Sequence, residues 1–100
     1  MQIREDPENN ETRALLNLVD FSGADVLEIG CGDGRLTYRY AEEAAKVTAI
    51  DPFEASIIRA KQNLPVKLRD RVEFQCIAFE DFAPQNRPAI FDTVILSWAL

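Results

Sequence analysis

The chain has 100 residues, of which 47% are hydrophobic, and its formal net charge is −6. This size suits one globular domain, and apolar runs this short cannot cross a bilayer, so neither a second domain nor a membrane span is expected. A chain without histidine and with two cysteines has almost no ligands for zinc. Residues 1–34 carry the whole net negative charge, and this charge argues against a nucleic-acid-binding face.

The start of the chain predicts a helical segment followed by a buried strand. Asp6 and Pro7 are typical of a helix start, and apolar residues then recur along one helical face, so we expect residues 1–23 to be an N-terminal helical segment. This polar beginning lacks the apolar core of a signal peptide, and we expect a cytoplasmic protein. Residues 26–29 are a short apolar run with one acid, which is typical of a buried parallel strand.

A second helix, a second strand and a third helix are predicted next. Apolar residues at intervals of three and four indicate a helix over residues 35–46, and residues 47–51 are typical of a strand that ends on an acid. Pro52 and Phe53 lead into the third helix, which Pro65 ends. The predicted buried face of that helix consists of Ile57, Ile58, Ala60 and Leu64.

The last part of the chain predicts two further strands. Residues 72–77 alternate between apolar and polar side chains, as a strand does, and residues 85–88 are predicted to be a loop. Residues 91–100 contain a fourth strand, whose uniformly apolar sequence favours a central place in the sheet. The alternation of strands and helices indicates an α/β domain over residues 24–100, with a mainly parallel sheet and right-handed crossovers.

Three of the four glycines, Gly30, Gly32 and Gly34, lie at alternate positions directly after the first predicted strand. Glycine permits a positive φ and lets another group approach the bare backbone closely. In a parallel α/β sheet, a turn of this kind lies at the carboxyl ends of the strands, where ligands bind. One glycine would suit a tight turn without a ligand, whereas three favour a ligand-binding loop.

The spacing of these glycines distinguishes between ligands. The dinucleotide fingerprint has the spacing G-x-G-x-x-G, and its last glycine would fall on Arg35. Residues 28–34, Glu-Ile-Gly-Cys-Gly-Asp-Gly, instead resemble the first motif of the Rossmann-like S-adenosylmethionine-dependent methyltransferases. The resemblance extends over residues 24–100. It implies a Rossmann-like three-layer sandwich, S-adenosylmethionine as the cofactor, and a glycine loop that packs against the methionine part of that cofactor.

Asp51 ends the second predicted strand, where this family places the acid that binds the ribose hydroxyls. A carboxylate suits this role because it can accept hydrogen bonds from both hydroxyls at once. Capping of the following helix is the alternative role for Asp51. The resemblance implies that Pro52 and Phe53 lie near the adenine, and ordinary core packing is the alternative for Phe53.

The third and fourth regions of the resemblance are less specific. Ala78 falls where the family often has an acid that contacts adenine, so a backbone contact from Ala78 or Phe79 is expected instead. Glu80 and Asp81 are interpreted as a solvated pair or a helix-start signal. Methyltransferases that act on adenine or amide nitrogen commonly have Asn-Pro-Pro-Tyr after the fourth strand, whereas residues 97–100 here are Ser-Trp-Ala-Leu, which favours a small-molecule acceptor. The cofactor-binding residues implied in this way are Glu28, Gly30, Cys31, Gly32, Gly34, Asp51, Pro52, Phe53, Ala78, Phe79 and Ser97.

The resemblance implies a methyltransferase, but the chain ends just after its fourth predicted strand, whereas the family's sheet has seven strands. A general base would come from loops after the fourth strand or from an N-terminal lid, so no catalytic residue is named, and no metal is expected. We expect a fragment of a longer protein. The alternatives are assembly through an exposed fourth-strand edge, as in a homo-oligomer, and a naturally short relative. Two other functions stay open, an aminopropyltransferase-like enzyme and a non-catalytic Rossmann-like module.

Overall fold

The computed structural model describes residues 20–86 and 90–97. The helix predicted within residues 1–23 therefore lies outside the described residues, apart from its last four positions. At that end the chain forms the expected turn, in which the Ser22 N–H donates to Asp20 Oδ1 at 2.9 Å. Phe21, beside this turn, is buried.

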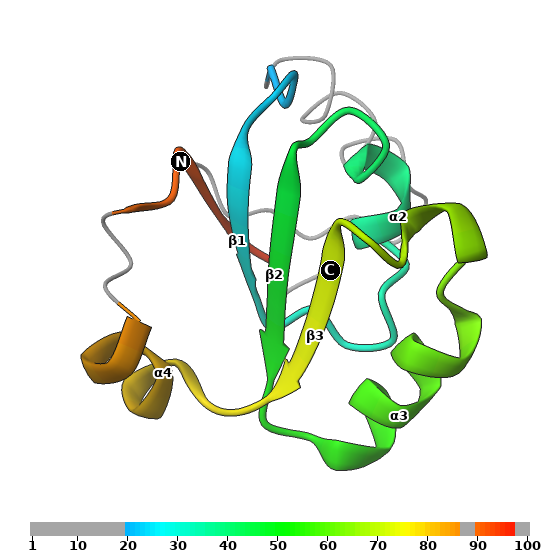
Figure 1. Ribbon diagram of the computed structural model, residues 1–100. Helices are drawn as coiled ribbons and strands as arrows, with labels where there is room; N and C mark the ends of the chain where they lie inside the picture. The colour runs from blue at the N-terminus through cyan, green and yellow to red at the C-terminus, as the bar shows by residue number, and fades with distance from the viewer. Residues whose placement is uncertain (1–19, 87–89, 98–100) are drawn as a thin grey trace.

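Four parallel strands form one sheet in the order β3, β2, β1, β4 (Figure 1). The strands are β1 (Asp25–Ile29), β2 (Lys46–Asp51), β3 (Val72–Cys76) and β4 (Thr93–Leu96). This confirms the predicted parallel α/β sheet. Among the described strands β4 lies at an edge and β1 and β2 lie inside the sheet, and the central place predicted for the fourth strand stays a prediction for a longer chain. An apolar strand sequence reflects how its two faces are covered, and it does not fix the order of the strands.

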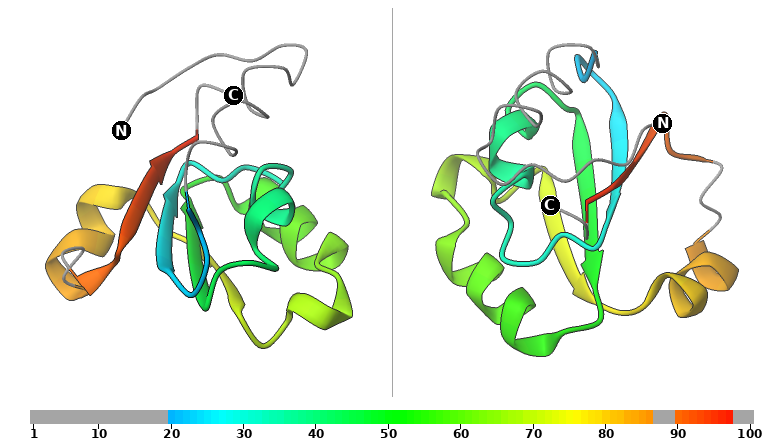
Figure 2. Two further views of the ribbon diagram at one scale, coloured as in Figure 1. Left: turned by 90° about the horizontal axis from the view of Figure 1, so that it is seen from above. Right: turned by 180° about the vertical axis from the view of Figure 1, so that it is seen from behind.

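Helices cover both faces of the sheet, as the predicted three-layer sandwich requires (Figure 2). On one face lie α2 (Thr37–Tyr40) and α3 (Glu54–Asn63), and on the other lies α4 (Phe79–Asn86). Successive β1 residues point to opposite faces, so Val26 joins the core cluster under α2 and α3, whereas Leu27 packs with Phe82 of α4. Both residues are fully buried.

The helix predicted over residues 35–46 is reduced in the structure to the single turn of α2. The reason lies in residues distant in sequence. The guanidinium of Arg71 donates to the carbonyls of Glu42 and Ala44, at 2.6 and 3.2 Å, and the Ala24 carbonyl accepts from the Ala45 N–H at 2.9 Å. These bonds hold the backbone of residues 42–45 outside the helical pattern and lead it into β2.

The remaining helices agree with the sequence in place and differ in detail. The third predicted helix is α3, and its burial of Ile57 and Ala60 is as expected, but Ile58 is 48% exposed because it follows Ile57 directly and turns away from the sheet. A short 3₁₀ turn, η1 (Val66–Leu68), precedes β3. Residues 85–86, predicted as loop, are the last two residues of α4. None of the described helices is long and apolar enough to cross a membrane.

Candidate functional site

The glycine loop connects β1 to α2, and its conformation depends on glycine. Gly30, Gly32 and Gly34 all have a positive φ, at 79°, 57° and 89°. A Cβ atom at Gly34 would lie 2.9 Å from the Tyr38 ring and 3.1 Å from Phe74, so this glycine also permits close internal packing. A Cβ atom at Gly32 would meet nothing within 4 Å. One side of the loop is therefore packed against the domain, and the other side is open.

Backbone hydrogen bonds anchor the loop to β2. The N–H groups of Gly30 and Cys31 both donate to the Ile50 carbonyl, at 2.8 and 3.1 Å, and the Gly34 N–H donates to the Cys31 carbonyl at 3.1 Å. The Cys31 side chain is buried, and burial raises the pKa of its thiol well above the usual range, with a smaller contribution from the nearby carboxyl groups. Cys31 therefore has the properties of a packing residue and lacks those of a nucleophile.

Asp51, at the end of β2, joins the glycine loop to the start of α3. Its Oδ2 accepts a hydrogen bond from the Gly32 N–H at 3.0 Å, and its Oδ1 accepts one from the Phe53 N–H at 2.9 Å. The second of these bonds forms a turn just before α3, whose N-cap residue is Phe53, and no side-chain hydrogen bond caps this helix, so capping, the alternative role suggested by the sequence, is not observed. Each carboxylate oxygen can still accept a further hydrogen bond. Asp51 is 6% exposed, which makes it nearly buried at the loop edge.

Apolar residues follow β2 and β3 at the carboxyl ends of these strands. Phe53 is 70% exposed, so the alternative of ordinary core packing for Phe53 was wrong. Phe79 is 38% exposed at the start of α4, and the Ile77 N–H donates to the Asp51 carbonyl at 3.1 Å, which ties the end of β3 to the end of β2. Pro52 is exposed and Ala78 is half-buried. Glu80 and Asp81 lie exposed in the first turn of α4, which confirms the helix-start interpretation.

Glu28 and Ser97 lie on the packed side of the loop, away from solvent. Glu28 is completely buried, and its Oε1 accepts hydrogen bonds from the hydroxyls of Thr37 and Tyr40 at 2.7 and 2.6 Å. Ser97 Oγ lies 2.8 Å from Glu28 Oε2. Burial raises the pKa of Glu28, while the three hydroxyl contacts lower it. The structure therefore brings together two residues from the sequence-based set, but as a buried cluster with α2.

Sequence reasoning missed Thr37 and Tyr40, which the structure places beside Glu28. The available signal was their spacing, because residues three apart on a helix share a face. A helix that packs on β1 would direct that face toward the acid on the strand. In the described ranges, 20–86 and 90–97, no group of three or more His, Cys, Asp or Glu residues could hold a metal ion.

The parallel strands define a Rossmann-like domain, and the glycine loop and the acid at the end of β2 meet at the carboxyl ends of β1 and β2, where domains of this kind bind ligands. Residues 20–100 match the family model described as a methyltransferase domain. The chain therefore belongs to the Rossmann-like S-adenosylmethionine-dependent methyltransferase family.

Individual relatives agree with this family. The chain is 42% identical over 72 residues to a ubiquinone biosynthesis O-methyltransferase of Idiomarina loihiensis, which covers 72% of this chain and 29% of that protein. A crystal structure from Listeria monocytogenes, provisionally assigned as an S-adenosylmethionine-dependent methyltransferase, is 31% identical with a TM-score of 0.72, covering 89% of this chain and 39% of the other.

The fold recurs in a structure with a bound cofactor product. The plantazolicin methyltransferase BpumL in complex with SAH, S-adenosylhomocysteine, is 24% identical with a TM-score of 0.60, covering 86% of this chain and 32% of the other. At this identity the likeness shows the shared fold alone. The chain thus spans about a third of the length of these relatives.

Proposed function

We propose that this chain is the S-adenosylmethionine-binding part of a methyltransferase that acts on a small molecule. The hydrogen bond between the Gly32 N–H and Asp51 Oδ2 is the observation that supports this most directly, because it joins the two motifs at one edge of the sheet. The glycine loop provides open backbone, and Asp51 provides a carboxylate with spare acceptor capacity. An adenosyl group needs both features together.

The residues at this edge fit the parts of such a ligand. The open side of the loop at Gly32 suits the methionine part, where a side chain would collide. Asp51 would accept hydrogen bonds from the ribose hydroxyls on the oxygens that already hold Gly32 and Phe53. The exposed rings of Phe53 and Phe79 supply apolar contacts for the adenine.

The remaining proposed site residues shape the site by the places that they occupy around it. Pro52 and Ala78 border the adenine contacts, Cys31 packs the loop from beneath, and Ser97 lies at the end of β4 beside Gly30. S-adenosylmethionine supplies a methyl group on a positively charged sulfur, so the task of the protein is to hold the reacting atoms in line and to exclude water. Little acid–base chemistry is obligatory in such a transfer.

For the acceptor we propose a small molecule with a hydroxyl group. This rests on the likeness to the ubiquinone biosynthesis O-methyltransferase and on the absence of Asn-Pro-Pro-Tyr at residues 97–100. The acceptor itself would be bound by parts of the longer protein, since the chain spans about a third of the relatives' length.

Calorimetric titration with S-adenosylhomocysteine tests the proposal. We expect saturable binding at one site, no binding of NAD, and weaker binding of decarboxylated S-adenosylmethionine than of S-adenosylmethionine. Equal or tighter binding of the decarboxylated form would indicate an aminopropyltransferase-like enzyme. A folded chain that binds none of the adenosyl ligands would contradict the proposed function.

A further inference from the structure

A completely buried carboxyl group, that of Glu28, lies within β1 between two apolar neighbours. Its register partners are Ala49 on β2 and Ile95 on β4, and both are buried. Within residues 20–86 and 90–97, no lysine or arginine forms an ion pair with Glu28. A carboxylate buried without a cation is costly, so the partners that Glu28 does have decide its state.

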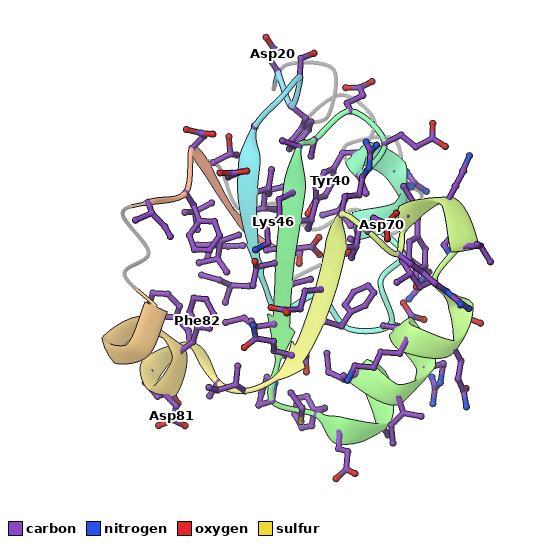
Figure 3. The ribbon with its side chains drawn as sticks, viewed as in Figure 1. Asp20, Tyr40, Lys46, Asp70, Asp81 and Phe82 are labelled. Carbon is purple, nitrogen blue, oxygen red and sulfur yellow. The ribbon has the colours of Figure 1, made fainter. Side chains whose placement is uncertain are left out.

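Three hydroxyl groups from two separate segments surround the carboxyl group. Thr37 and Tyr40 of α2 both donate to Oε1, and Ser97, which follows β4, lies against Oε2. Tyr40 is the last residue of α2 (labelled in Figure 3), and its ring stacks on Phe21 with centroids 4.5 Å apart. The stacking and the burial fix the direction of the Tyr40 hydroxyl.

The contacts of Ser97 allow two arrangements of the protons. Its single hydroxyl proton faces three acceptors, namely Glu28 Oε2 at 2.8 Å, the Gly30 carbonyl at 3.0 Å and the Ile29 carbonyl at 3.3 Å. A backbone carbonyl can only accept. When Ser97 donates to Gly30, the short contact with Oε2 needs a proton that comes from Glu28. In that arrangement every donor and acceptor in the cluster has a partner.

We propose that Glu28 is a neutral carboxylic acid that donates a hydrogen bond from Oε2 to Ser97, whose hydroxyl donates in turn to the Gly30 carbonyl. This relay links α2 and the end of β4 to the first residue of the glycine loop. Glu28 is then a positioning residue, which neither contacts the ligand nor contributes charge to the site. The inference concerns the protein alone and does not depend on which ligand binds.

Burial favours the neutral form of Glu28, whereas its hydrogen bonds from Tyr40, Thr37 and Ser97 favour the charged form. Burial raises its pKa, and the groups nearest to it are the thiol of Cys31 in the loop and the phenol of Tyr40 on α2. The pKa of each of these two groups is raised by burial and further by Glu28. Asp51 at the end of β2 and Asp33 in the loop also raise the pKa of Cys31. β4 contributes Ile95 and the adjoining Ser97, which are uncharged.

Infrared spectroscopy at neutral pH tests the protonation state directly. We expect a band from a protonated carboxyl group in the wild-type protein, and we expect the band to disappear in Glu28→Gln. Labelling the glutamates with carbon-13 in the wild-type protein must shift the band, which assigns it to a glutamate even if the variant does not fold. A wild-type spectrum without such a band at neutral pH would overturn the proposal.

The pH dependence of stability provides a second readout. Because the folded-state pKa of Glu28 is raised above 4.5, its contribution to stability is fully present below the unfolded pKa and is lost as the pH rises through the folded pKa. The folding equilibrium constant of the wild type relative to Glu28→Gln should therefore fall by up to about tenfold per pH unit in that window. Glutamine can donate to Ser97 as the neutral acid does, but it does not titrate. A ratio that stays constant between about pH 5 and pH 7 would contradict the relay.

Discussion

Gly32 and Gly34 stand two residues apart in one loop, but their surroundings differ. A Cβ atom at Gly32 would meet nothing within 4 Å, whereas one at Gly34 would press on the rings of Tyr38 and Phe74. The two acids near the loop divide in the same way. Asp51 accepts from backbone N–H groups at the loop edge, and Glu28 is enclosed by hydroxyl side chains. One motif thus contains an open side, where we propose that the ligand binds, and a packed side that fixes the backbone.

This comparison shows why a sequence motif does not specify the role of each of its residues. Glu28 and Gly32 belong to the same pattern of an acid and alternating glycines, but only Gly32 lies on the open side. Side chains alternate between the two faces of β1, and that of Glu28 points to the face that α2 covers. Substitutions on the two sides should therefore separate stability from ligand affinity.

The largest expected loss of stability is that of Gly34→Ala. The new Cβ atom would collide with the Tyr38 ring, which is held in place by the hydrogen bond from the Tyr38 hydroxyl to the Ala60 carbonyl. In addition, residue 34 has a φ of +89°, which strains any residue other than glycine. We expect a loss of about 3 kcal/mol in the free energy of unfolding, measured by urea denaturation. Gly32→Ala is the matched control, because it carries only the cost of a positive φ, about 1 kcal/mol. Equal losses in the two variants would contradict the division of the loop into two sides.

The largest expected loss of affinity is that of Asp51→Ala. Removing the carboxylate takes away the proposed acceptor for two ribose hydroxyls and the bond that places Gly32, so the affinity for S-adenosylhomocysteine should fall on the order of 100-fold in calorimetry. Some stability is lost as well, since Asp51 also accepts from the Phe53 N–H. Asp51→Asn keeps an oxygen for the Phe53 N–H, and its stability should lie closer to the wild type. An unchanged affinity in a folded Asp51→Ala variant would show that Asp51 is purely structural.

Tyr40→Phe tests the packed side. It keeps the ring stacked on Phe21 and removes one hydroxyl donor to Glu28, at an expected cost of about 1 kcal/mol. Because the Tyr40 hydrogen bond lowers the pKa of Glu28, its loss raises that pKa further, and the decline of stability with pH should extend to higher pH.

Tyr38→Phe is the control for this pH dependence. It also removes one hydroxyl hydrogen bond, the one to the Ala60 carbonyl, but that bond lies outside the Glu28 cluster. Urea denaturation at several pH values should show a similar loss of stability for both variants and a changed pH profile for Tyr40→Phe alone. The same pH profile in both variants would argue against a titrating Glu28.

Much of the fold followed from local sequence signals. The alternating glycines predicted the positive φ values, the apolar runs predicted four strands, and Pro65 predicted the end of α3. These features depend on residues adjacent in the chain, since backbone conformation at a glycine or before a proline is set locally. The family motif adds the expectation of a cofactor site at the strand ends, which stays a prediction.

The parts that the sequence did not predict depend on contacts between distant residues. The early end of α2 results from Arg71, which binds carbonyls about 27 to 29 positions earlier in the chain. The partners of Glu28 include Ser97, which is 69 positions away and reaches it only because β4 pairs with β1. Periodicity and spacing carry no information on such pairings.

The smallest expected effect comes from Phe53→Ala, which changes the open side alone. Phe53 is 70% exposed and its N–H bond to Asp51 is a backbone contact, so stability should change by less than about 0.5 kcal/mol. Loss of a ring that stacks on adenine should weaken binding of S-adenosylhomocysteine by about tenfold in calorimetry. Val66→Ala is the matched control, because Val66 is 75% exposed in η1, which precedes β3 and so lies at the opposite end of the sheet. Equal affinities for the two variants would remove Phe53 from the proposed site and leave the adenine contact to Phe79.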